Sequence, residues 1–125
     1  MASRPRKPTD AELTILRVLW SQGPCTVRQV AEALGRETSY TTILKLLQIM
    51  AEKNLVHRDE TARTHVYEAA YSEDQTQRQL VTDLLERAFG GSASKLVLQA
   101  LATSKATPKE LAEIKKLLEK HGGAQ

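Results

Sequence analysis

The chain has 125 residues, of which 41% are apolar and only 4% aromatic, with a single cysteine and a formal net charge of +3. This length suits one ordinary domain, or one compact domain with an appendage, and a core built mainly from aliphatic side chains favours helices. One cysteine excludes an intramolecular disulfide and a cysteine-rich metal cluster, no apolar run reaches the roughly 20 residues that span a bilayer, and the mild positive charge is compatible with nucleic-acid binding without requiring it.

Residues 1–8 predict a flexible basic arm, because they contain two prolines and three basic side chains. The segment lacks the apolar stretch of a secretory signal, so a cytoplasmic location is expected. Arg6 and Lys7 could contact a polyanion or serve only to keep the chain in solution.

Residues 9–35 predict two amphipathic helices. A capping box at residues 9–12 starts the first helix, which ends before the breakers Gly23 and Pro24. A second capping box at residues 26–29 starts a shorter helix. Residues 25–26 are too short a segment for the sequence pattern to predict a strand.

Residues 39–54 predict a third helix, capped by Ser39 and ended by Asn54 in a left-handed conformation. Its apolar positions follow the i, i+3, i+4, i+7 spacing of a half-buried helix. These core-facing positions are Ile43, Leu46, Leu47 and Met50. The opposite face is polar except for Leu44.

The sequence period changes to two after residue 54. Residues 55–58 and 64–69 have the β-branched and aromatic content of short strands, and the polar residues 59–63 join them as a hairpin. A two-stranded hairpin is only marginally stable in isolation, so we expect it to pack against the helices. Three helices followed by a hairpin wing predict a winged helix-turn-helix over residues 9–71.

Residues 72–125 predict three further helices rich in leucine, which makes the whole chain mainly α. About 55 residues is marginal for an independent core, so we expect this segment to be a dimerisation domain. The alternative is that these helices fold back onto the winged helix in a monomer. The candidate dimerisation residues are the apolar positions Val81, Leu84, Leu85, Phe89, Leu98, Leu101, Leu111, Ile114, Leu117 and Leu118.

The outward face of the third helix predicts an interface with double-stranded DNA. In a helix-turn-helix this helix lies in the major groove, and its hydroxyl, amide and cationic groups can bond bases or phosphates. The candidate DNA-binding residues are Ser39, Tyr40, Thr41, Thr42, Lys45 and Gln48 on the helix, Arg58, Arg63 and His65 on the hairpin, and Arg6 and Lys7 on the arm.

Two other interpretations of that face stay open at this point. The polar side chains could form only a solvated surface, or the winged helix could mediate protein–protein assembly, since a fold does not dictate its partner. Leu44, expected to be exposed, favours a protein partner. An enzyme is not expected, because His57, His65 and His121 are isolated from any nucleophile or carboxylate constellation. No cofactor and no metal are expected either.

Three stretches in order resemble the penicillinase and methicillin-resistance repressors and the related copper-responsive repressors of bacteria. They are residues 9–20, residues 39–56 with the run Tyr-Thr-Thr-Ile-Leu-Lys-Leu-Leu, and residues 84–118 with Phe-Gly-Gly-Ser and Leu-Val-Leu. The resemblance implies a homodimer with interlocked C-terminal helices that represses by binding a dyad operator over a promoter. It also implies recognition-helix contacts at Thr41, Thr42 and Lys45 and a wing arginine at Arg63.

Two departures from these families concern release from DNA. In the β-lactam branch, the resemblance implies cleavage of an Asn-Phe bond directly after a Leu-Val-Leu run, but here Gln99 and Ala100 follow that run. Gln can imitate the amide of Asn, whereas Ala cannot fill a pocket made for Phe. Gln99 and Ala100 are therefore a disfavoured cleavage site, and a signal-activated protease of different preference is an alternative partner. The copper branch carries a C-terminal Cys-x-Cys cluster, and its absence excludes metal sensing by that route.

Overall fold

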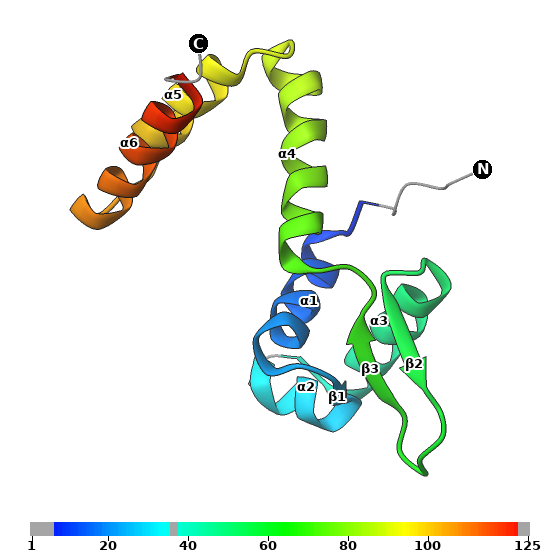
Figure 1. Ribbon diagram of the computed structural model, residues 1–125. Coiled ribbons are helices and arrows are strands. Elements are labelled where there is room, and N and C mark those ends of the chain that lie inside the picture. The colour runs from blue at the N-terminus through cyan, green and yellow to red at the C-terminus, as the bar shows by residue number, and fades with distance from the viewer. Residues whose placement is uncertain (1–6, 36–37, 123–125) are drawn as a thin grey trace. The chain divides into compact units, whose positions relative to one another are not determined.

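The computed structural model describes residues 7–35 and 38–122, and the winged helix predicted from the sequence is confirmed (Figure 1). The chain divides into two compact units between Val81 and Thr82. The elements in order are α1 (Asp10–Gln22), β1 (Cys25–Thr26), α2 (Val27–Leu34), α3 (Tyr40–Glu52), β2 (Val56–Asp59), β3 (Val66–Ala69), α4 (Glu73–Phe89), α5 (Ala93–Thr103) and α6 (Pro108–Gly122).

The helices of the first unit begin at the capping signals that the sequence predicts. The amide of Glu12 donates to Thr9 Oγ1 at 3.2 Å, and the amide of Thr9 donates back to Glu12 Oε1 at 2.9 Å. A second reciprocal pair of the same kind starts α2 at Thr26. These bonds satisfy backbone donors that the first turn of a helix leaves unpaired, which sets where each helix starts. Asn54 ends the α3 segment with a φ of 62°, as predicted.

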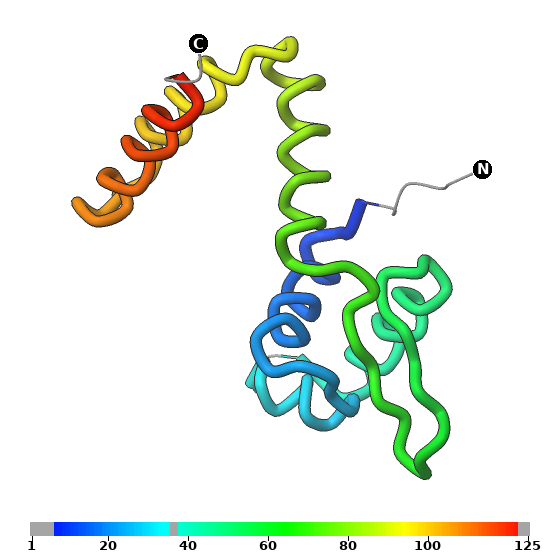
Figure 2. The backbone as a smooth tube through the Cα atoms, viewed as in Figure 1, coloured from blue at the N-terminus to red at the C-terminus, as the bar shows by residue number. Residues whose placement is uncertain are grey.

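The wing is a three-stranded antiparallel sheet in the order β1-β3-β2, so the prediction of a two-stranded hairpin is incomplete. Cys25 pairs with Tyr67 and Thr26 pairs with Val66. A two-residue strand has no sequence pattern of its own and forms only because the edge of β3 is available to it. The loop between β2 and β3 covers residues 60–65 and extends beyond the strands (Figure 2).

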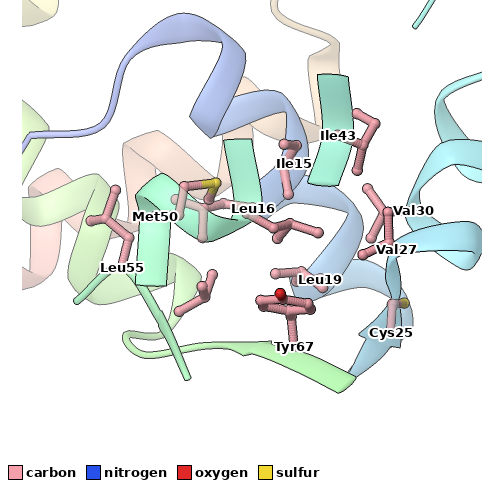
Figure 3. Close-up of a cluster of buried hydrophobic side chains, with 12 residues drawn as sticks. Ile15, Leu16, Leu19, Cys25, Val27, Val30, Ile43, Met50, Leu55 and Tyr67 are labelled. Carbon is pink, nitrogen blue, oxygen red and sulfur yellow. The ribbon is translucent and has the colours of Figure 1, made fainter. Parts of the chain in front are cut away.

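The core of the first unit is a single cluster of buried side chains (Figure 3). The side chain of Tyr67 on β3 is 1% exposed and faces Leu19 of α1 within that cluster. Helix α3 buries Ile43, Leu47 and Met50. Leu46, the fourth residue of the predicted stripe, is half-buried and packs against this cluster. Among the residues that the structure describes, the buried apolar side chains are Ile15, Leu16, Leu19, Cys25, Val27, Val30, Ile43, Leu47, Met50, Leu55, Val56 and Tyr67.

A buried ion pair connects α1 to the carboxyl end of α3. Lys53 Nζ lies 2.8 Å from Glu12 Oε1 and 2.9 Å from Oε2, and the Glu12 side chain is only 2% exposed. Burial by itself raises the pKa of Glu12, but the hydrogen bonds from Lys53 and Thr9 and the charge of Lys53 outweigh it. The pKa of this carboxyl therefore lies below its ordinary value of 4.5.

The first turns of α4 belong to the winged-helix unit. The indole Nε1 of Trp20 donates to the backbone oxygen of Tyr71 at 3.0 Å, and Thr76 is buried. These contacts explain why the two compact units divide within α4, whereas the sequence pattern places the boundary between residues 71 and 72.

We expect Lys53→Met to lower the free energy of unfolding by about 2 kcal/mol at pH 7, because it leaves a buried carboxylate without its cation. With its folded-state pKa lowered, Glu12 stabilises the native state above pH 4.5, and this contribution is lost as the pH falls through the lower folded pKa. The difference between wild type and Lys53→Met should therefore shrink as the pH falls from 7 to below 4.5.

Urea unfolding followed by circular dichroism across that pH range measures the effect. Lys45→Met, which removes an exposed lysine of α3, is the control and should leave stability within about 0.5 kcal/mol of wild type. A Lys53→Met deficit that stays constant across the range contradicts the role given to Glu12.

Candidate nucleic-acid interface

Helix α3 presents a polar stripe opposite the stripe that it buries. Thr41, Lys45 and Gln48 are spaced i, i+4, i+7, so they share one face, and all three are exposed. An α-helix fits the major groove of B-DNA, where amide, hydroxyl and ammonium groups can meet base edges and phosphates. The stripe therefore has the position and the chemistry of a recognition surface.

The amino end of α3 gathers hydroxyl groups around backbone amides. Ser39 Oγ accepts from the amide of Thr42 at 3.2 Å and lies 2.9 Å from Thr42 Oγ1. Tyr40 is 51% exposed at the same end. The amides and the positive end of the helix dipole favour an anion here. The Ser39 and Thr42 hydroxyls already contact each other, so a phosphate bound here would accept hydrogen bonds from a pair of hydroxyls that is already in place.

A further cation that the sequence analysis missed lies beside this end of α3. Arg28 of α2 lines a surface depression together with Thr38 and Tyr40. The first helix of a helix-turn-helix crosses the DNA backbone, so the position of Arg28 just after the α2 cap could have identified it. Arg28 is therefore an additional candidate phosphate contact.

The wing carries the three basic residues that the sequence singles out, and Arg58, Arg63 and His65 are all exposed. The carboxylate of Asp59 shapes the loop by accepting from the amide of Thr61 at 2.9 Å and from its hydroxyl at 2.7 Å. The backbone hydrogen bond from Thr61, followed by the one from its hydroxyl, holds the pKa of Asp59 below its ordinary value.

Two of those wing residues converge on a carboxylate that the sequence analysis did not consider. Glu60 Oε1 lies 3.4 Å from the Nη2 atom of Arg58 and 3.8 Å from Nε2 of His65. Arg63 is not part of this cluster. The wing therefore combines basic residues with an acidic one at its turn.

Leu44 is half-buried and packs against the core, so the expectation that it is exposed is wrong. The helix turns Leu44 far enough from the polar stripe to reach the core cluster. Ile49, 36% exposed, is the aliphatic side chain that α3 leaves accessible. The outward surface of α3 thus offers less apolar area to a protein partner than the sequence suggests.

The basic arm is described only in part. Lys7 is exposed, and Arg6 lies outside the described residues.

The second unit exposes most of its large apolar side chains. None of the residues described between 82 and 122 reaches the burial of the core in the first unit. Leu98 is 65% exposed and Leu118 is 60% exposed. Of the predicted dimerisation residues, the exposed ones are Val81, Leu84, Leu98, Leu101, Leu111, Leu117 and Leu118, and the half-buried ones are Leu85, Phe89 and Ile114.

The Gln99–Ala100 bond lies inside α5, and both residues are exposed. The backbone oxygen of Gln99 accepts from Thr103 Oγ1 at 2.8 Å. Because a protease binds its substrate in an extended conformation, α5 would have to unwind here before this bond could be cut.

Cys25 has the surroundings of a packing residue. It belongs to β1 and its side chain is buried in the core, and burial raises the pKa of its thiol, which disfavours the reactive thiolate. Across residues 7–35 and 38–122, no three His, Cys, Asp or Glu side chains gather to hold a metal ion. The helices in the same ranges are all too short or too polar to cross a membrane.

Comparison with known proteins gives matches over nearly the whole chain. The penicillinase repressor family model matches residues 8–120. The transcriptional regulator BlaI of Mycobacterium tuberculosis is 40% identical over 92 residues, which cover 71% of this chain and 67% of that protein. The penicillinase repressor of Bacillus licheniformis is 24% identical over 115 residues, covering 90% of each chain.

A solved structure supports the fold. The YusO protein from Bacillus subtilis aligns over 94% of this chain and 76% of its own, with a TM-score of 0.50 at 19% sequence identity. At that identity the likeness concerns the fold alone.

Proposed function

Because the chain belongs to the penicillinase repressor family of transcriptional regulators, we propose that it represses transcription by binding a dyad DNA operator as a homodimer. It is a winged-helix transcriptional repressor and not an enzyme. The observation that carries the proposal is the exposed stripe of Thr41, Lys45 and Gln48 on α3, opposite the stripe that α3 buries.

In this proposal helix α3 lies in the major groove of the operator, and each residue of its stripe makes a different kind of contact. The methyl group of Thr41 can pack on a thymine methyl group, and the amide of Gln48 can pair with adenine. Lys45 can donate to guanine or to a phosphate. Because the stripe mainly contacts bases, most of the phosphate contacts come from side chains outside it.

Phosphate contacts hold the protein in register on the duplex. Those proposed at the amino end of α3 come from Ser39, Tyr40, Thr42 and Arg28. The wing adds Arg58, Arg63 and His65, and the arm adds Arg6 and Lys7. Since DNA is the partner, the proposed location is the bacterial cytoplasm.

A second copy of the chain is the proposed occupant of the apolar surface of the second unit. A unit that leaves leucines such as Leu98 and Leu118 largely exposed gains little hydrophobic stabilisation by itself. Pairing with an identical surface buries these side chains in a two-fold arrangement. The same two-fold axis places two copies of α3 on successive major grooves, which requires a dyad operator.

Release from DNA by cleavage between Gln99 and Ala100 is disfavoured. Ala100 stands where the resemblance to the β-lactam branch implies Phe, and the bond before it lies within α5. A signal-activated protease that acts on this chain would therefore need a different preference at that bond, or a different bond.

We expect operator affinity to fall about 10³-fold between 50 and 200 mM salt if six or more phosphates are neutralised. A duplex of about 30 bp, selected from a random library by the protein and long enough for two half-sites, is the probe, and fluorescence anisotropy gives the dissociation constant. An affinity that does not respond to salt contradicts the proposed phosphate contacts, and failure to select any duplex supports protein–protein assembly instead.

Lys45→Ala should weaken binding to this duplex by about 1–3 kcal/mol, because it removes a cation from the centre of the stripe. Lys116→Ala, on α6 of the second unit, removes the same charge outside the winged helix and is the matched control. Equal effects of the two substitutions would reduce the role of Lys45 to its contribution to net charge.

Substitutions of Ser39 can separate helix capping from phosphate binding. Ser39→Asp keeps a good cap and should leave stability nearly unchanged, but its negative charge should weaken DNA binding by about tenfold or more. Ser39→Ala loses the cap and should cost about 1 kcal/mol of unfolding free energy. Thermal unfolding and anisotropy measure the two effects, and unaltered DNA affinity of Ser39→Asp removes this site from the interface.

Leu118→Glu should convert the protein from dimer to monomer and lower operator affinity by about 100-fold or more through loss of avidity. Ala112→Glu adds the same charge to an exposed position on the polar side of α6 and should leave the dimer intact. Sedimentation velocity at micromolar concentration distinguishes the states. A Leu118→Glu protein that still sediments as a dimer would falsify this interface.

A further inference from the structure

The turn of the wing places a carboxylate beside Arg58 and His65, two residues that are proposed to bind DNA. Glu60 Oε1 is within 3.4 Å of Arg58 and 3.8 Å of His65, and the same oxygen makes both contacts. All three side chains are accessible, with exposed fractions of 57% for Glu60, 35% for Arg58 and 44% for His65. A DNA phosphate that approaches the wing therefore meets a competing anion.

The shape of the wing does not depend on Glu60. Its neighbour Asp59 makes the hydrogen bonds to Thr61 that close the turn. Within the part of the chain that the structure describes, the Glu60 carboxylate contacts Arg58 and His65. A structural role for this carboxylate is consequently small, whereas its electrostatic effect falls on two candidate phosphate contacts.

We propose that Glu60 acts as an electrostatic brake on DNA binding, by pairing with Arg58 and His65 in the DNA-free repressor and competing there with DNA phosphates. The inference rests on the proposed DNA-binding function. A phosphate must displace the Glu60 carboxylate to reach these side chains, and the displaced carboxylate stays close to the phosphate and repels it. Exposed ion pairs are weak in water, so the brake is modest.

The brake acts on every duplex alike, because phosphates carry no sequence information. It lowers the affinity for operator and for random DNA by the same factor and leaves their ratio unchanged. A carboxylate can also accept a hydrogen bond from the N4 amino group of cytosine. In that case Glu60 would strengthen binding to a particular sequence, and the two roles predict opposite effects of its removal.

Glu60→Gln in the full chain tests the proposal, because the amide keeps the size of the side chain and removes its charge. We expect about three- to tenfold tighter binding at 50 mM salt, both to the selected operator duplex and to a scrambled duplex of equal length. The gain should diminish at 200 mM salt, since screening weakens exposed charges. Glu119→Gln adds the same unit of net charge outside the winged helix and should change affinity less than twofold.

A double-mutant cycle that combines Glu60→Gln with Arg58→Ala measures the energetic coupling between these two side chains. The gain from Glu60→Gln should shrink when Arg58 is absent, because the carboxylate has then lost its closer partner. Unchanged affinity of Glu60→Gln, or a gain equal to that of Glu119→Gln, overturns the brake while leaving the repressor function intact. Selective weakening of the operator complex assigns Glu60 to base recognition instead, and a wild type that binds neither duplex rejects the proposed function itself.

Discussion

The burial of one stripe of α3 is the constraint on which the rest of the winged helix depends. Ile43, Leu47 and Met50 are completely enclosed by the other elements of the first unit. Each fully buried aliphatic side chain contributes about 1.5–3 kcal/mol relative to an exposed one, so rotating α3 about its axis would cost several of these contributions. The same burial determines which residues of α3 face outward, and therefore which side chains are available for the proposed DNA contacts.

An ion pair with α1 and a capping hydroxyl define the two ends of that helix. The Glu12–Lys53 pair connects the carboxyl end of α3 to α1, and an ion pair removed from water is sensitive to the loss of either partner. At the amino end, Ser39 closes the first turn and leaves the end open to solvent. Tyr67 packs the wing against the same core, so the wing and α3 share one support.

The two units of the chain differ in how much of their apolar side-chain surface they bury. The first unit encloses a core of aliphatic side chains around Tyr67, whereas the second leaves leucines such as Leu98 exposed. This difference agrees with the division of roles that we propose, in which the first unit binds DNA and the second unit pairs with a second copy of the chain. Dimerisation then sets the operator symmetry that is proposed for the protein.

The sequence by itself determined the helix starts, the order of helices and wing strands, and the polar stripe of α3, because capping residues and apolar periodicity act over a few neighbouring residues. Only the tertiary structure decided the features that depend on contacts between distant residues. These are strand β1 on the edge of β3, the partial burial of Leu44, the pair between Glu12 and Lys53, and the hydrogen bond from Trp20 of α1 to Tyr71 just before α4. The acidic partner of the wing cations belongs to the same group, since whether Glu60 meets His65 depends on how the turn between the strands closes.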